Sequence, residues 1–87
     1  MTRAPYSSKQ YRKALGSVLR SLRRHARMSQ EAAAEAADMD RSYLSELENG
    51  QHDTVSFKVA TLAAIYGTTF AEIAARIEAE AIKRAKH

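Results

Sequence analysis

Two short helical segments follow one another within residues 29–49, and their spacing constrains the fold of the chain more than any other feature. Ser29 precedes an alanine-rich run, and Asp40 precedes a second run that Gly50 ends. Serine and aspartate are preferred N-caps, and glycine is preferred directly after a helix end. The segment therefore predicts two short helices separated by about three residues, which is a helix-turn-helix.

The rest of the chain predicts three further helices and no strand. Leu15, Leu19 and Leu22 recur at helical spacing, and Ser56 and Thr69 are placed to cap two later helices. We expect an all-α domain of five helices over residues 9–85, after a flexible leader at 1–8 and with a polar loop at 51–55. The expected helices cover residues 9–27, 30–37, 41–49, 57–66 and about 70–85.

The apolar positions of these helices predict the core. They repeat at spacings of three and four residues, so they share one face of each helix. The expected core residues are Leu15, Leu19, Leu22, Ala33, Ala37, Leu44, Leu47, Phe57, Leu62, Ala63, Phe70 and Ile73.

Basic and acidic residues are separated along the chain, whose net charge is +4. Residues 1–27 hold eight Lys and Arg and no acid, residues 28–82 hold three against all ten acids, and the last five residues hold three more. A small domain polarised in this way suits an anionic partner, with nucleic acid the commonest and an acidic membrane surface the competitor. The alternative is a solvated charged helix that binds nothing.

Length and composition exclude several classes of protein. A domain of 87 residues buries only about 60% of the surface of its unfolded chain, which leaves little room for a deep catalytic pocket. The chain has no cysteine, hence no disulfide framework. No apolar run approaches the roughly 18–20 residues of a membrane span, and no signal peptide is recognisable. We expect a soluble cytoplasmic domain without a membrane partner.

Residue types that serve catalysis are present but are not arranged for it. His25, His52 and His87 are too scattered for a preformed metal site, and the three glycines form no phosphate loop. No serine motif is tied to a histidine and a carboxylate. We therefore expect no enzymatic activity, no cofactor and no metal.

Four separated blocks match a known family in the right order. They are Leu-Gly-x-x-Leu-Arg-x-Leu-Arg from Leu15, Ser-Gln-Glu from Ser29, Arg-Ser-Tyr-Leu-Ser from Arg41 and Leu-Glu-Asn-Gly from Leu47. Over roughly residues 13–75 the chain resembles the XRE family of phage-repressor and Cro-type helix-turn-helix proteins, and most of all the small controller proteins of restriction–modification systems. The resemblance implies a lambda-repressor-like fold with a long C-terminal helix. It also implies a dimer that binds short palindromic operators.

The start of the second short helix carries side chains that can contact bases. Arg41, Ser42 and Tyr43 occupy its first turn, which can enter a major groove, and Ser45 and Glu46 follow one turn later. Arginine can donate two bonds to guanine, and glutamate can accept from cytosine N4. The alternatives are a solvent-facing Arg41 and a Glu46 that only repels phosphate.

A second set of polar residues is predicted to contact phosphates. The resemblance implies that Gln30, at the start of the first short helix, contacts a phosphate, and helix starts favour anions in general. For Asn49, helix capping is the alternative. The predicted phosphate-contacting set is Gln30, Arg20, Arg24, Arg27, Asn49, Gln51 and His52.

The resemblance also implies a structural ion pair between Arg23 and Glu48. The chain departs from the family at Ala33, where a leucine is usual, and at Asp38, which replaces the usual turn glycine. Aspartate tolerates left-handed backbone better than most residues but less well than glycine. Because the alanine at position 33 is smaller than the usual leucine, the first short helix is expected to contribute little buried volume.

The last helix is longer than a small core needs. Its inner half is expected to pack on the domain, and its outer half, around Ile77 and Ala81, is predicted to form a dimer seam with Ile65 and Tyr66. Two-fold dimers of helix-turn-helix domains read palindromic sites. The alternative is a frayed helix with a basic tail.

These expectations combine into a homodimeric, sequence-specific transcriptional regulator that binds double-stranded operator DNA. One alternative is the antitoxin of a toxin–antitoxin pair, which binds both DNA and a toxin. Another is an antagonist that keeps the fold and binds a protein through its basic face. A protein partner such as a toxin or RNA polymerase is left open, as are the operator sequence and the choice between activation and repression.

Overall fold

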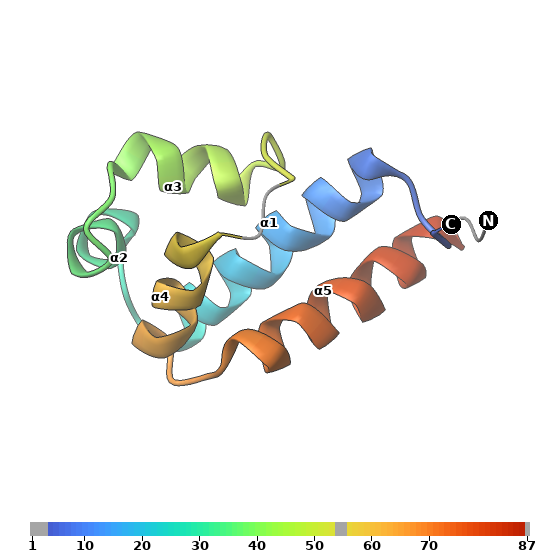
Figure 1. Ribbon diagram of the computed structural model, residues 1–87. Coiled ribbons are helices and arrows are strands. Elements are labelled where there is room, and N and C mark those ends of the chain that lie inside the picture. Colours follow the sequence, from blue (N-terminus) through green and yellow to red (C-terminus); the bar gives the residue numbers. More distant parts are fainter. Residues whose placement is uncertain (1–3, 54–55, 87) are drawn as a thin grey trace.

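The computed structural model describes residues 4–53 and 56–86, and within them it has five helices and no strand, as the sequence predicts (Figure 1). The leader residues 1–3, the loop residues Thr54 and Val55, and His87 lie outside the described residues. The helices are α1 (Ser8–His25), α2 (Gln30–Ala36), α3 (Arg41–Glu48), α4 (Phe57–Ile65) and α5 (Phe70–Ala85).

α1 is the central element of the fold. α3 packs on one side of α1, and α5 runs antiparallel to it on the other side (Figure 1). α2 and α4 lie together near the C-terminal end of α1, where α2 contacts α3 and α4 contacts α5. The helix-turn-helix of α2 and α3 therefore rests on a scaffold made mainly by α1 and α5.

The helix starts follow the predicted caps in part. Ser29 Oγ accepts a hydrogen bond from the Ala32 backbone N–H at 3.0 Å, and Thr69 caps α5 in the same way. Asp40 and Ser56 occupy N-cap positions without a side-chain cap bond. α1 starts at Ser8, one residue before the predicted start, because Ser7 and Gln10 form a capping box.

Four helices end in the same backbone motif. The second residue beyond each of α1 to α4 has a left-handed φ, and paired bonds run back from it and from its successor into the last turn, as in a Schellman motif. The left-handed residues are Arg27 (φ 59°), Asp38 (φ 53°), Gly50 (φ 77°) and Gly67 (φ 77°). Glycine marks two of these ends in the sequence, and Asp38 takes the conformation expected for a turn glycine.

The core agrees with most of the predicted positions. Ten of the twelve expected residues are buried, and Ala14, Val18, Ala34 and Val59 join them. α2 places only alanines in the core, so its buried contacts are small.

Phe57 and Phe70 were predicted in the core, and this prediction is wrong. Phe57 is 85% exposed and Phe70 is 43% exposed. Each is the first residue of its helix, where Cβ tilts back toward the N-terminus and directs the side chain beyond the helix end. Phe57 is also out of phase with the buried positions of α4, which begin at Val59.

The predicted dimer seam is wrong in three of its four residues. Ile77 is 1% exposed and Ala81 is fully buried, because α5 packs along α1 of the same chain for most of its length. Tyr66 is also buried in the core, and only Ile65 is half-buried and reachable from outside. The length of α5 therefore serves the scaffold.

Gly16 is required where α1 meets the end of α3. A Cβ built on Gly16 would lie 2.5 Å from the Glu48 carbonyl oxygen and 2.7 Å from that of Leu47. Both atoms belong to backbone, which cannot move aside as a side chain can. The glycine inside α1 thus lets α3 approach closely enough for side chains of α1 to reach Glu48.

Candidate nucleic-acid interface

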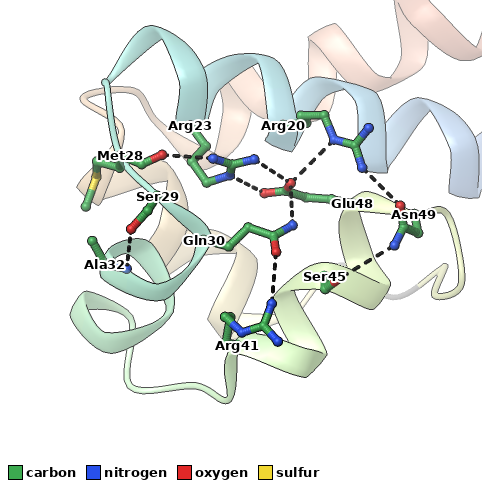
Figure 2. Close-up of polar contacts among 10 residues, drawn as sticks. All are labelled: Arg20, Arg23, Met28, Ser29, Gln30, Ala32, Arg41, Ser45, Glu48 and Asn49. Atoms are coloured by element: carbon green, nitrogen blue, oxygen red, sulfur yellow. Dashed lines mark hydrogen bonds and ion pairs between the residues drawn. The ribbon is translucent and has the colours of Figure 1, made fainter.

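A buried ion pair fixes the end of α3 to α1. Arg23 Nε and Nη2 donate to the two carboxylate oxygens of Glu48 at 2.8 Å and 3.0 Å, while Arg23 Nη1 donates to the Met28 carbonyl at 2.8 Å (Figure 2). The Glu48 side chain is fully buried and that of Arg23 is nearly so. Bidentate pairs of this kind restrict the relative orientation of the two elements that carry them.

Gln30 completes this arrangement from α2. Its Nε2 donates to Glu48 Oε1 at 3.1 Å, so one carboxylate holds side chains from α1 and α2 at once. Arg20 Nε lies 3.5 Å from the same oxygen. We call Arg23, Gln30 and Glu48 the polar anchor, since together they join α1 to both helices of the helix-turn-helix, α2 and α3.

The polar anchor keeps Glu48 ionised. Burial alone would raise its pKa, but the hydrogen bonds from Arg23 and Gln30 and the charges of Arg23 and Arg20 outweigh burial and hold the pKa of the carboxyl below its usual value. The hydrogen bond to Glu48 likewise raises the pKa of Arg23. Both charges are therefore stable at neutral pH.

Tyr66 reaches the same region from the end of α4. Burial and the charge of Glu48 raise the pKa of its phenol to about 12. The hydroxyl is buried and has no hydrogen-bond partner among the described residues. It is therefore a polar group whose burial is not compensated by a hydrogen bond.

The predicted base-contacting residues lie on the outer side of α3. Leu44 and Leu47 turn inward and are buried, whereas Arg41 and Ser42 are exposed. Tyr43, Ser45 and Glu46 are partly exposed. The structure thus leaves all five residues at least partly accessible, although Tyr43 also packs against the core.

Gln30 links this surface to the polar anchor. Arg41 Nη1 donates to Gln30 Oε1 at 3.4 Å, while the amide nitrogen of Gln30 is bound to Glu48 (Figure 2). The predicted phosphate contact and the predicted guanine contact are therefore neighbours in space. Gln30 is half-buried. Its bond to Glu48 orients the side-chain amide, so that the amide oxygen faces Arg41.

Two further predicted phosphate contacts are joined at the other end of α3. Arg20 Nη2 donates to Asn49 Oδ1 at 3.0 Å, and Asn49 Nδ2 donates to Ser45 Oγ at 3.4 Å (Figure 2). Asn49 follows the last residue of α3 and is exposed. These bonds place the Arg20 guanidinium next to the C-terminal end of α3.

His52 lies beside α3 as well. Its Nε2 is 2.9 Å from Glu46 Oε1, and its ring lies against that of Tyr43 with centroids 5.0 Å apart. Of the other predicted phosphate contacts, Arg24, Arg27 and Gln51 are exposed. The sequence placed His52 in a loop and did not predict its contact with α3.

Sequence reasoning also missed two cations in a cleft next to Asn49. An open cleft of about 520 Å³ is lined by Lys13, Arg20, Arg24 and Arg84, together with Ser17, Ser21, Glu48, Asn49 and Gly50. Lys13 follows the helical spacing of Arg20 and Arg24, so its position could have been found. Arg84 comes from α5, and only the tertiary fold brings it here. The cleft has the charge expected of a phosphate-binding surface.

The described residues meet the requirements of neither a metal site nor a membrane-spanning helix. They contain no group of three or more His, Asp or Glu side chains that could hold a metal ion. None of their helices is both long and apolar enough to cross a membrane.

Comparisons with known proteins agree with this geometry. A family model described as a helix-turn-helix domain matches residues 14–75. Two solved structures of the clp gene regulator ClgR from Corynebacterium glutamicum are similar to the chain. The first is 30% identical with a TM-score of 0.80, covering 87% of this chain and 81% of that chain. The second is 31% identical with a TM-score of 0.73, covering 80% and 90%. No curated protein matches the chain.

Proposed function

The chain belongs to the helix-turn-helix domain family, and from this we propose that it is a sequence-specific, DNA-binding regulator of transcription and not an enzyme. One observation carries the proposal. The outer surface of α3 presents Arg41 and Ser42 to solvent, while the other side of the same helix is fixed by buried leucines and by Glu48. A rigid helix with an accessible first turn of hydrogen-bonding side chains is suited to the major groove.

Charge around α3 supports contact with the DNA backbone. Arg24, Arg27 and Gln51 are exposed, and Lys13, Arg20 and Arg84 line the cleft beside Asn49. Such residues hold phosphates and set the orientation of the protein, whereas the α3 side chains read bases. The similarity to ClgR, a regulator of clp genes, supports a regulatory role.

The proposal includes a homodimer on a palindromic operator, because one recognition helix reads only a half-site. Since Ile77 and Ala81 are buried, the second copy has to use another surface. The α4–α5 turn is the best remaining candidate, as Ile65 is half-buried and Phe70 is exposed there. Sedimentation of the free chain and of its DNA complex tests the stoichiometry.

The test of the proposed function is selection of bound duplexes from a random pool, followed by titration of the selected and a scrambled duplex. We expect log K to fall with log[salt] by about 0.9 for each phosphate contacted. Arg41→Ala should reduce the preference for the selected duplex by about tenfold or more. Arg76→Ala, which removes the same charge from an exposed position of α5, is the control. Equal affinity of the wild-type chain for both duplexes would contradict the proposal.

An antitoxin role is the alternative function, and one observation favours it. Phe57 is almost fully exposed and lines an open cleft of about 600 Å³ with Met39 and Tyr43. An exposed aromatic group of this kind is typical of protein contacts. Co-purification with the product of an adjacent reading frame, and its loss in Phe57→Ser, would support this alternative. Retained sequence-specific binding in Phe57→Ser would show that the two functions are separable.

A further inference from the structure

A histidine outside the helix-turn-helix contacts two of the base-facing side chains. His52 Nε2 lies 2.9 Å from Glu46 Oε1, and the His52 and Tyr43 rings lie 5.0 Å apart at a tilt of 43°. The backbone sets this geometry. Left-handed Gly50 turns the chain back at the end of α3, and the Gln51 N–H donates to the Glu46 carbonyl at 3.0 Å. Residue 52 is thereby returned to the level of residue 46.

We propose that His52 is a positioning residue that determines the base preference of Glu46. The proposal rests on the function proposed above. His52 was expected to contact a phosphate, but its Nε2 is engaged by a side chain of the recognition helix. It acts on DNA through Glu46 and Tyr43.

The chemistry of the pair supports this role. A carboxylate only accepts hydrogen bonds, so the proton of the His52–Glu46 bond belongs to the imidazole. Donation to Oε1 leaves Oε2 of Glu46 able to accept from an amino group such as cytosine N4. Both side chains are partly exposed, so the carboxylate remains accessible to a base edge.

Preorganisation explains why such a contact matters for a glutamate in particular. A glutamate side chain has several rotatable bonds, and the phosphates around a groove repel its charge, so an unrestrained side chain leaves the groove. Restricting it in its binding conformation lowers the entropy lost on binding. The Tyr43 ring limits the movement of the imidazole, so the three side chains hold one another.

The experiment compares base preferences, position by position, after selection from a random duplex pool. The variants are His52→Ala, His52→Gln, Glu46→Ala and the double variant. His52→Gln retains an N–H donor. Arg76→Ala, at an exposed position of α5 outside the proposed DNA-contacting surface, is the control.

We expect His52→Ala to lose about fivefold of preference, the worth of one hydrogen bond, at the same base pair that Glu46→Ala affects. His52→Gln should keep most of that preference. The double variant should be no worse than Glu46→Ala at that base pair. Affinity for scrambled duplex and the salt dependence should be unchanged in His52→Ala.

Two results would overturn the assignment. Wild-type base preference in His52→Ala would show that Glu46 needs no positioning. A loss that is equal on selected and scrambled duplexes, with a smaller salt dependence, would show that His52 contacts a phosphate instead. Both differ from failure of the proposed function, in which the wild-type chain itself selects no sequence and the role of His52 fails with it. Circular dichroism of each variant verifies that it is folded at the assay temperature.

Discussion

The two sides of α1 both bury apolar side chains, but only one of them also carries a buried polar anchor. On the side of α5, the large apolar side chains Ile73 and Ile77 of that helix are buried. Toward the helix-turn-helix, α2 buries only alanines and α3 buries Leu44 and Leu47, and the polar anchor adds directional contacts. Hydrophobic burial is non-directional, whereas a bidentate ion pair fixes an orientation. The scaffold therefore provides stability, and the polar anchor provides the angle at which α3 is presented.

The largest loss of stability is expected when one partner of the polar anchor is removed. Glu48→Ala should lower the free energy of unfolding by about 3–5 kcal/mol, because Arg23 is left as a buried charge without its partner. Urea unfolding followed by circular dichroism measures the loss. Selected-duplex affinity should fall further than the unfolded fraction explains, since α3 loses its orientation.

The matched control for Glu48→Ala removes both charges. Replacing Arg23 and Glu48 together by methionine should restore much of the stability, as apolar replacements of buried ion pairs often do. DNA affinity should remain low, because stability returns without the bidentate geometry. If the double variant bound DNA as well as wild type, the polar anchor would not set the orientation of α3.

A cavity in the scaffold should separate stability from DNA binding. Ile77→Ala should cost about 3 kcal/mol, because Ile77 is almost completely buried between α5 and α1. Ile82→Ala, in the same helix but only half-buried, is the matched control and should cost less than about 1 kcal/mol. Below the melting temperature, folded Ile77→Ala should keep wild-type affinity and salt dependence. A loss of base preference would mean that the scaffold also tunes α3.

Tyr66 lies where the two regions meet, and it predicts an alkaline effect. The pKa of Tyr66 is about 12 in the folded chain against 10.0 normally, so the unfolded chain releases this proton first. Stability should therefore fall as the pH rises from 10 toward 12. Tyr66→Phe should abolish this part of the fall and raise stability at neutral pH by about 1 kcal/mol, since the buried hydroxyl has no hydrogen-bond partner within residues 4–53 and 56–86. Urea unfolding at several pH values, with Tyr6→Phe as control, measures both effects.

The sequence predicted what short-range rules determine. Helical spacing and caps predicted the order and number of the helices, with Ser29 and Thr69 as caps. Gly16 stands inside the predicted first helix, and the end of α3 approaches α1 there. The pairing of Arg23 with Glu48 came from the family resemblance, since nothing in local spacing brings together residues 25 positions apart.

The features that the sequence did not predict depend on which helix and loop surfaces pack against each other in the fold. The apolar stripe of α5 has the same spacing whether Ile77 and Ala81 face α1 or a second copy of the chain. Spacing alone could not decide between the two, and the predicted dimer interface was wrong because both residues face the core. Phe57 is apolar but out of phase, and helical phase decided its exposure. The His52–Glu46 contact and the arrival of Arg84 in the basic cleft depend on loop and tertiary geometry that composition does not encode.

The smallest predicted effect concerns Arg27, where one substitution should raise the stability of the fold and weaken DNA binding. Arg27 takes a left-handed φ of 59° at a helix end where Gly50 and Gly67 occupy the equivalent positions after α3 and α4. The conformation costs a branched or long side chain roughly 1–2 kcal/mol, and glycine loses part of that advantage through the entropy of the unfolded chain. Arg27→Gly should therefore raise stability by only about 0.5 kcal/mol.

The same substitution should weaken DNA binding, since Arg27 is exposed on the basic side and is a predicted phosphate contact. We expect similar losses on selected and scrambled duplexes, and a salt slope smaller by about 0.9. Asp38→Gly is the matched control, because Asp38 has a φ of 53° in the same motif but carries a negative charge. It should gain stability without losing affinity. If both variants bound DNA equally well, the left-handed backbone at Arg27 would have no functional reason, and the arginine would be only a solvated residue of the turn after α1.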